Sequence, residues 1–321
     1  MKGCSTLSWL IKMSEHRILL IENPASLSVD LGRLRIRRDG FDDSFVLPRD
    51  IAVLCLHHHT IQVSVQTLRL LAQASVSVMV TDEIHHPCAW LLPQVGNGDL
   101  VRRLRQQMVL DTSVSKGDLW QALVQARLNT QAVNLRVLNR KGALRLERLA
   151  NEVQHADKTK CEGQGAKHYW AYLFKDRFKR EKQGAEDTIN ARLNFGYAVL
   201  RSMVARSLVM AGLNPALGLG HCNMENPFNL ADDFIEPYRF VVERHVALGD
   251  SGELANEFDG AARKQVLGFV EQEIKLNGAG YRLPAAINES VASFVRVLDG
   301  RAKQLTLPQD VITQPNDGSW A

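Results

Sequence analysis

HCNMENPFNLADDFIEPYR, residues 221–239, joins a histidine to an acidic cluster and a proline, and the organisation of the chain can be worked out from it. His221 stands fifteen positions before Glu236, which Pro237 follows directly. An imidazole and a carboxylate together are ligands for a divalent metal that acts on phosphate or carbonyl oxygens. Two ligands are too few, so a third must come from elsewhere in the chain. The alternative for His221 is a hydrogen-bonded structural histidine at a helix–loop junction.

The acidic residues of this stretch share one face of an expected helix. A helix that begins near Asn229 places Asp232, Asp233 and Glu236 at i, i+3 and i, i+4 spacing. Such a face is commonly solvated. Pro237 lacks a backbone N–H and disfavours the helical conformation of the residue before it, so we expect a kink or break beside the Glu236 carboxylate.

The best candidate for a third ligand is Glu162, in CEGQGAKHYW. The apolar residues of the following helix recur at the spacing of a buried stripe, at Ala166, Tyr169, Trp170, Leu173, Phe174 and Phe178. Glu162 extends this stripe toward the N-terminus, where an ionised carboxylate facing the interior needs a compensating charge. The alternative is that Glu162 lies outside the helix and caps it. His168 is either a proton relay near the metal or a partly buried ring on an aromatic helix.

The clearest long helix is predicted over Thr188–Met210. Its apolar residues keep a helical period, Asp187 or Thr188 can cap its start, and Gly212 can end it. We expect it to fix the His221 turn against the Glu162 helix.

Length and composition favour a two-domain α+β protein. The chain has 321 residues, with 45% hydrophobic and 23% charged residues, which excludes wholesale disorder. We predict a small β-rich N-terminal domain over residues 13–94 and a larger all-helical, metal-binding catalytic domain over residues 95–307. Residues 1–12 are expected to be an extension, because Met13 begins a more natural start, and residues 308–321 a flexible tail.

Alternation of apolar and polar residues indicates the β-rich domain. Leu27, Val29 and Leu31 alternate with polar neighbours, and Gly32 is a candidate hairpin or bulge position. Continuous apolar strands are expected over residues 51–56 and 76–80, with a helix over residues 67–74 between them. The run at residues 57–59, three histidines, suits a loop after a strand better than a metal site, because neighbours on a strand point to opposite faces.

Cysteine usage and hydropathy bear on the compartment. The five cysteines are odd in number, scattered and without a CxxC pair, so neither a disulfide framework nor a cysteine zinc site is implied. The N-terminus lacks the extended apolar region of a cleavable signal peptide. Residues 195–220 are apolar, but Arg201 and Arg206 interrupt them, which favours a core helix over a membrane span. We expect a cytoplasmic protein.

Charge is distributed unevenly along the chain. Residues 101–182 contain 18 Lys and Arg against 8 Asp and Glu, whereas the remainder contains 21 against 27. This asymmetry favours a bound polyanion, with solvated basic helix faces as the alternative. The segment KDRFKREKQG is expected to continue the Glu162 helix outward and to supply DNA-binding side chains, at Lys175, Arg177, Lys179, Arg180 and Lys182.

Three motifs carry a family resemblance: CEGQGAKHYW, DTINARLNFGYAVLRS and AGLNPALGLGHCNMENPFNLADDFIEPYR. In this order and spacing the chain resembles the CRISPR adaptation integrases, the "Cas one" proteins, and most of all the type II branch found beside Cas nine effectors. The resemblance implies that Glu162, His221 and Glu236 bind one divalent metal and are catalytic, and that Asp233 supports the site. The last ligand is Glu where many relatives have Asp.

The resemblance also implies a function. We expect a metal-dependent DNA endonuclease that acts as an integrase, using Mg²⁺ or Mn²⁺, and inserts short DNA duplexes (spacers) into a repeat array by attack of a 3′-hydroxyl on a phosphodiester. Arg239 either contacts a phosphate beside the metal or forms a surface ion pair. Implied partners are double-stranded DNA, a second copy of the chain in a homodimer, and a small ferredoxin-like "Cas two" protein that completes a heterohexamer. The effector nuclease complex is a further candidate partner.

Two functions of other classes remain open. One is a non-catalytic DNA-binding scaffold with a structural polar cluster, and the other is a metal-dependent hydrolase of a small substrate.

Overall fold

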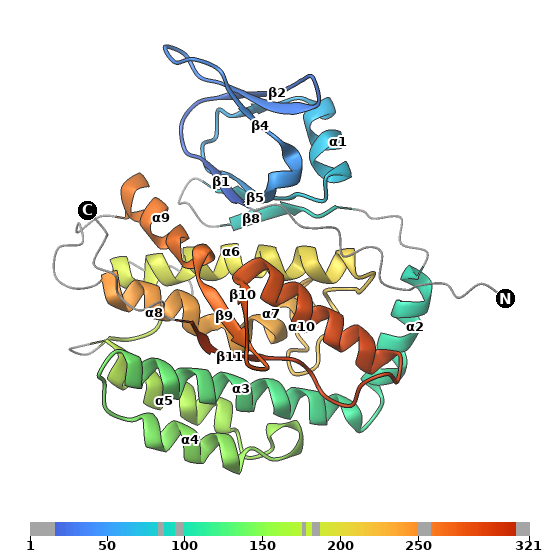
Figure 1. Cartoon of the computed structure of the whole chain (residues 1–321), viewed down its shortest axis with the longest axis vertical. Coiled ribbons are helices and arrows are strands. Elements are labelled where there is room, and N and C mark those ends of the chain that lie inside the picture. The colour runs from blue at the N-terminus through green and yellow to red at the C-terminus, as the bar shows by residue number, and fades with distance from the viewer. Residues whose placement is uncertain are drawn as a thin grey trace. The chain divides into compact units, whose positions relative to one another are not determined.

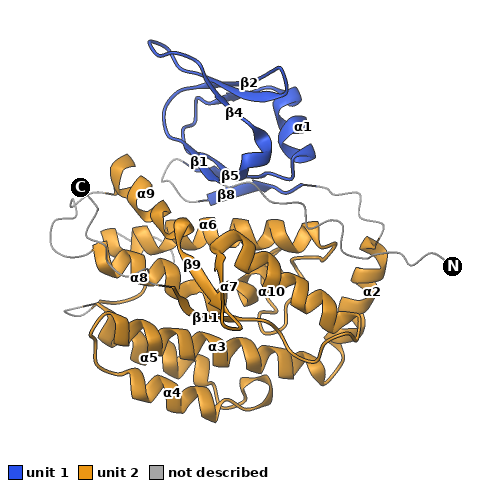
Figure 2. Ribbon diagram, in the orientation of Figure 1, with its two compact units in different colours: residues 1–93 blue, residues 94–321 orange. Residues whose placement is uncertain are grey.

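The computed structural model describes residues 17–82, 87–93, 99–174, 178–181, 187–249 and 258–312. The chain divides into two compact units, residues 1–93 and 94–321 (Figure 2). This division adjoins the expected boundary at residue 94. The first unit is rich in strands and the second mostly helical, so the α+β class is confirmed. The expected extension at residues 1–12 lies outside the described residues.

Unit 1 contains two four-stranded sheets, with strand orders β1-β5-β7-β8 and β4-β3-β2-β6 (Figure 1). The elements are β1 Arg17–Ile21, β2 Ser26–Asp30, β3 Arg33–Arg37, β4 Ser44–Val46, η1 Pro48–Asp50, β5 Ile51–Leu56, β6 Gln62–Val63, α1 Val65–Gln73, β7 Ser77–Thr81 and β8 Pro87–Leu91. Strands β5 and β7 pair in parallel and are connected through β6 and α1, the strand–helix–strand unit that the sequence predicted. Strand β1 also pairs with β5 in parallel.

The predicted hairpin at Gly32 is confirmed. Strands β2 and β3 are antiparallel, and their two-residue turn has positive φ at both Leu31 (47°) and Gly32 (76°). Both angles match a type I′ turn, whose twist suits a hairpin. Leu27 and Leu34 project from the two strands into the core of the unit, at 1% and 0% exposure.

Unit 2 is built from long helices. Its elements are α2 Leu100–Asp111, α3 Ser115–Val137, α4 Ala143–Glu152, η2 His155–Asp157, α5 Cys161–Leu173, α6 Thr188–Met210, α7 Asn229–Ile235, η3 Glu236–Tyr238, α8 Arg239–Gly249, α9 Gly260–Leu267, η4 Gly268–Glu271, β9 Glu273–Leu276, β10 Ala279–Arg282, α10 Leu283–Leu298 and β11 Pro308–Val311. Helix α6 has the predicted bounds, and the Asp187 side chain accepts the Asn190 N–H as its cap. No helix among the described residues is long and apolar enough to cross a membrane.

Three expectations for unit 2 are wrong. The unit is not all-helical, because β9, β10 and β11 form a three-stranded sheet in the order β10-β9-β11. Residues 308–311, expected to begin a flexible tail, form β11, where Val311 pairs with Ile274. The helix that carries Glu162 also does not continue outward, since α5 ends at Leu173 and residues 178–181 are not helical.

Helix α3 brings distant parts of unit 2 together. It packs against α4, α5 and η3, and α6 packs against α7, α8 and α10 (Figure 1). The Thr130 hydroxyl on α3 donates to the Pro237 carbonyl at 3.5 Å, and this contact links α3 to η3. The first motif on α5 and the acidic stretch on α7 and η3 therefore meet on α3.

Candidate metal and phosphodiester site

Glu162 and Glu236 converge on one guanidinium group, that of Arg127 on α3. Arg127 Nη1 contacts Glu162 Oε1 and lies 2.8 Å from Glu236 Oε2. The side chains of Arg127 and Glu236 are 4% and 3% exposed, whereas Glu162 is 32% exposed and so reaches solvent. Two of the three predicted ligands, separated by more than seventy residues in the sequence, thus share one small volume.

Glu162 lies inside its helix rather than capping it. It is the second residue of α5, and the cap is instead the Asp157 carboxylate. Asp157 accepts the Cys161 N–H at 2.8 Å and the Glu162 N–H at 3.1 Å. Because these backbone donors are already satisfied, the Glu162 side chain is free to turn toward α3. The capping alternative is wrong, and the Glu162 side chain contacts the buried Arg127 while it remains 32% exposed.

Pro237 breaks the acidic helix where the sequence indicated. Helix α7 ends at Ile235, and Glu236 begins the 3₁₀ turn η3, with Pro237 in its first positions. Glu236 and its neighbours Asp232 and Asp233 are buried, so the solvated-face alternative is wrong.

Two guanidinium groups keep Glu236 charged. Arg239 Nη1 donates to Glu236 Oε1 at 2.8 Å, on the side opposite the Arg127 contact. Burial alone favours the neutral acid, but the charges of Arg127 and Arg239 outweigh it and lower the pKa of Glu236. Arg239 is itself 13% exposed and lies over the Tyr197 ring at 4.3 Å, so it is not part of a surface ion pair.

The turn before His221 is assembled around Asp233. This buried carboxylate accepts the backbone N–H groups of Leu219, Gly220 and His221, and His221 Nδ1 lies 2.8 Å from Asp233 Oδ1. The hydrogen bond from His221 raises the pKa of the imidazole. A carboxylate that binds Nδ1 fixes the ring and leaves Nε2 as the ligand atom, as in many metal sites.

Trp120 supports the same turn from α3. Its ring lies edge-on to the His221 ring, with centroids 5.7 Å apart. A Cβ on Gly220 would lie 2.2 Å from an indole carbon of Trp120, so only glycine fits here. The supporting role expected for Asp233 is therefore matched by its position, and Trp120 is an additional support.

The donor types fit a divalent ion, although the side chains do not yet form a complete site. Among the residues that the structure describes, no three His, Cys, Asp or Glu side chains are close enough to hold a metal as they stand. Arg127 takes the place of a cation between the carboxylates. The buried Glu236 Oε2 still lacks a hydrogen bond of acceptable geometry. Carboxylate oxygen and imidazole nitrogen are suitable ligands for Mg²⁺ or Mn²⁺, with the histidine favouring Mn²⁺.

The other predicted site residues lie elsewhere or outside the described part. His168 Nε2 bonds to the carbonyl of Gly142, the residue before α4, at 2.9 Å, and its ring packs against Tyr172. It is therefore a structural histidine on α5, and its position does not support the proton-relay alternative. Arg180 is half-buried and bonds to the side chains of Asn190 and Asn194. Lys179 is exposed. The remaining DNA-binding candidates, Lys175, Arg177 and Lys182, lie outside the described residues.

Sequence reasoning missed Arg127, Asp157 and Trp120. Arg127 lies between Val124 and Leu128, within the buried stripe of α3, and is thus a charge at a core position. The argument that an inward charge needs compensation, applied above to Glu162, would have marked Arg127 as a buried charge in need of a partner, without naming that partner. Asp157 and Trp120 carry no comparable signal, because their contacts depend on the tertiary fold.

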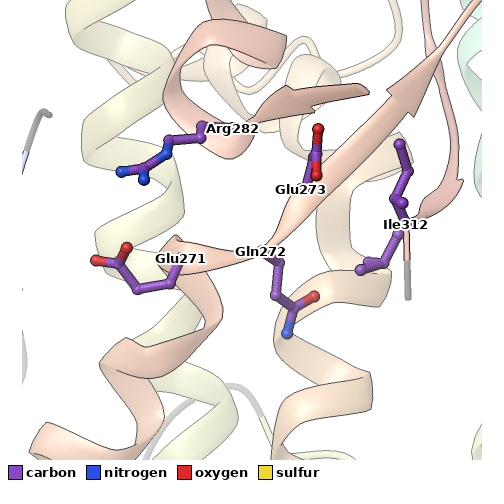
Figure 3. A pocket seen from close by; sticks show the side chains of 6 residues that line it. Glu271, Gln272, Glu273, Arg282 and Ile312 are labelled. Carbon is purple, nitrogen blue, oxygen red and sulfur yellow. The ribbon is translucent and has the colours of Figure 1, made fainter. Parts of the chain in front are cut away.

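A separate surface cavity of about 380 Å³ lies at the small sheet of unit 2 (Figure 3). It is lined by residues of η4, β9, β10 and β11 and the residues next to them, namely Glu271, Gln272, Glu273, Arg282, Val311 and Ile312. The predicted ligands Glu162, His221 and Glu236 do not line this cavity, so the cavity is not the candidate site.

Comparison with known proteins agrees with the geometry. The family described as "CRISPR associated protein Cas1" matches residues 18–267. The CRISPR-associated endonuclease Cas1 of Neisseria meningitidis serogroup C is 36% identical over 297 residues, covering 91% of this chain and 96% of the relative. A second relative is CRISPR-associated endonuclease Cas1 2 of Pyrobaculum aerophilum, which is 27% identical over 256 residues. This alignment covers 74% of this chain and 84% of the relative.

Solved structures share the fold at lower identity. A casposase bound to its integration product has a TM-score of 0.78 at 18% identity, covering 90% of this chain and 92% of the casposase. A CAS1 protein from Thermotoga maritima has a TM-score of 0.71 at 14% identity, covering 88% and 97%. Because the family match spans most of the sequence and the Neisseria relative is similar over nearly its whole length, the chain belongs to the Cas1 family of CRISPR-associated proteins.

Proposed function

We propose that this protein is a metal-dependent DNA endonuclease and integrase that joins short duplexes to a repeat array by attack of a 3′-hydroxyl on a phosphodiester. The observations that support this most directly are the meeting of Glu162 and Glu236 at one cationic nitrogen and the electrostatic interaction of His221 with Glu236. The Neisseria relative is a CRISPR-associated endonuclease, and the casposase with the same fold holds an integration product.

The proposed metal ligands are Glu162, His221 and Glu236, with Mg²⁺ or Mn²⁺ as the ion. When bound, the ion would polarise the phosphoryl oxygens and favour the attacking oxygen. The protein contributes orientation and charge. Asp233 fixes the His221 ring through Nδ1, and Arg239 fixes the Glu236 carboxylate through Oε1. Arg239 carries a positive charge next to the carboxylates and is the nearest candidate for a phosphate contact.

The proposed partners follow from the reaction and from the relatives. Insertion of a duplex needs two strand transfers, so we propose a homodimer, and a Cas2-type protein that bridges two dimers into a heterohexamer. A structure with the same fold is a Cas6-RT-Cas1–Cas2 complex, with a TM-score of 0.70 at 15% identity. Double-stranded DNA is the proposed substrate, held by basic side chains that include Lys179 and its neighbours in residues 175–182.

The decisive experiment combines the purified chain, a Cas2-type partner, a linear duplex and a supercoiled repeat plasmid, with and without Mg²⁺ or Mn²⁺. Joined products that need the metal support the proposal. Glu162→Ala and His221→Ala should abolish joining and preserve duplex binding. Glu289→Ala is the matched control, because Glu289 is an acid of unit 2 that pairs with Arg296 on α10 and should leave joining unchanged.

The same experiment separates the two alternatives. A non-catalytic scaffold would bind DNA and yield no joined products from any variant. A hydrolase of a small substrate would lack steeply salt-dependent DNA binding. Neutralising the basic residues in 175–182 should weaken duplex binding, with the slope of log K against log salt falling by about 0.9 for each phosphate that the protein no longer neutralises. Unchanged binding would mean that DNA lies on another surface.

A further inference from the structure

Arg127 is a permanent cation placed where the metal is proposed to act. It lies in the middle of α3, with its side chain 4% exposed, and its Nη1 touches one oxygen from each of Glu162 and Glu236. A guanidinium group does not lose its proton in proteins. Arg127 therefore compensates one of the two carboxylate charges before any ion arrives.

Arg127 is hydrogen-bonded on one side of the carboxylate pair only, because its Nη1 donates to Glu162 Oε1. Arg127 Nε has no hydrogen-bond partner, and Glu236 Oε2 receives no hydrogen bond despite its 2.8 Å distance from Nη1. The buried guanidinium of Arg244 is instead held at two nitrogens, because its Nε donates to Asn134 Oδ1 at 2.6 Å and its Nη2 to Asp310 Oδ1 at 2.7 Å. Because hydrogen-bonded ion pairs are the stronger ones, the Glu236 side of the contact is the easier one to exchange for another cation.

We propose that Arg127 is a resident counter-ion of the Glu162–Glu236 pair, which holds the two carboxylates together in the metal-free protein and competes with the divalent ion. Arg127 is thus a positioning residue that sets the affinity of the site. This inference rests on the metal site proposed above. Binding of the ion needs Nη1 to withdraw from at least one carboxylate, so the free energy of that contact is subtracted from the free energy of metal binding.

The test is Mn²⁺ binding to the full-length protein, measured by the loss of the free-ion electron paramagnetic resonance signal, together with thermal unfolding with and without Mn²⁺. Arg127→Gln removes the competing charge, so its Mn²⁺ affinity should rise on the order of tenfold. Its Tm should be lower than that of the wild type without metal, and the increase in Tm caused by Mn²⁺ should be larger. Arg127→Lys keeps the charge on a shorter group, so its Mn²⁺ affinity should lie between those of the wild type and Arg127→Gln.

Arg244→Gln is the matched control, because it removes an equally buried guanidinium that pairs with Asp310 instead. It should lower Tm equally with and without Mn²⁺ and leave Mn²⁺ affinity unchanged. Equal or weaker Mn²⁺ binding by Arg127→Gln would overturn the counter-ion role. If Arg127→Gln does not fold, the Mn²⁺ affinity of Arg127→Lys is the deciding measurement. An affinity no higher than that of the wild type would also overturn the counter-ion role. Absence of Mn²⁺ binding in every variant, or binding unaffected by His221→Ala, would instead overturn the metal site.

Discussion

At the scale of single residues, buried charge is the main energetic feature of the site. Glu236 is 3% exposed, and its two oxygens face two different guanidinium groups, those of Arg127 and Arg239. Removing one partner from a buried ion pair leaves the other charges without compensation, which costs more than the intact pair contributes.

Glu236→Gln keeps the shape of the side chain and removes its charge. We expect the free energy of unfolding of the metal-free protein to fall by about 3–5 kcal/mol, because two buried guanidinium groups lose their common anion. Urea unfolding in the presence of a chelator measures this. The control is Glu289→Gln, whose partly exposed pair with Arg296 should contribute less than about 1 kcal/mol. Equal effects of the two substitutions would contradict the assignment of Glu236 as a buried anion.

The site residues show what a sequence can and cannot reveal at this scale. Glu162, His221 and Glu236 could be selected because an inward carboxylate, an imidazole and an acid before proline each carry a chemical signal in their local sequence. Arg127 could not be linked to them, because the contact joins three helices and depends on how α3 packs. Local periodicity shows which way a side chain faces but not which other side chain it meets.

At the scale of elements, the turn from residue 218 to 221 depends on glycine for space rather than for backbone freedom. Gly220 has no room for a Cβ, whereas a Cβ on Gly163, in the first turns of α5 beside Glu162, meets open space. The two glycines flank the site from different elements and provide a matched pair.

We expect Gly220→Ala to displace the indole of Trp120 or the His221 turn, lowering stability by about 1–3 kcal/mol and weakening Mn²⁺ binding. Gly163→Ala should raise stability by up to about 1 kcal/mol, because alanine favours a helix interior and nothing opposes it there. Thermal unfolding and Mn²⁺ titration of both variants check this. If Gly220→Ala had no effect on Mn²⁺ affinity, this turn would not position a ligand.

Helix α10 is tied to α2 by one carboxylate. Asp299, just after α10, lies 2.5 Å from Arg103 Nη1 and 3.0 Å from Arg102 Nη1 and accepts from Gln106 Nε2 at 3.1 Å. Burial opposes ionisation, but hydrogen bonds from Arg103 and Gln106 outweigh it and hold the pKa of Asp299 well below its usual range.

The contribution of this carboxylate should therefore depend on pH in a defined direction. The folded pKa lies below the unfolded value of about 3.9, so the stabilisation is complete above that value and disappears as pH falls through the folded pKa. Asp299→Asn should cost about 1.5–3 kcal/mol near neutral pH, and the difference from wild type should shrink below about pH 4. Urea unfolding across pH tests this. Asp111→Asn, which removes an exposed pair with Lys116, should cost less than about 1 kcal/mol.

The elements that were predicted correctly had strong local signals, and those that were missed did not. Helix α6 combines a long apolar period with an Asp187 cap and a terminal Gly212 at φ 77°, so both ends were defined by the sequence. Strands β9 and β10 have four residues each, too few for alternation to stand out among helices. The third strand, β11, is recognised only through its pairing with β9, since its own residues resemble a polar tail.

At the scale of the whole molecule, each of the two units contains buried hydrophobic residues of its own. The core of unit 1 gathers residues from its strands and α1, among them Leu27, Leu34 and Leu71. Each unit also contains one buried and one exposed cysteine among the described residues: Cys55 and Cys88 in unit 1, Cys161 and Cys222 in unit 2.

These four thiols report on the stability of each core. Burial raises the pKa of Cys55 to about 12, and the thiolate is the reactive form, so native alkylation should label Cys88 and Cys222 and spare Cys55 and Cys161. Mass spectrometry after a short pulse of iodoacetamide in increasing urea should give one labelling midpoint for Cys55 and another for Cys161. Asp299→Asn weakens a contact of unit 2, so it should lower the Cys161 midpoint and leave that of Cys55 unchanged. A single midpoint shared by both cysteines, shifted equally by Asp299→Asn, would show that the two cores unfold as one cooperative structure.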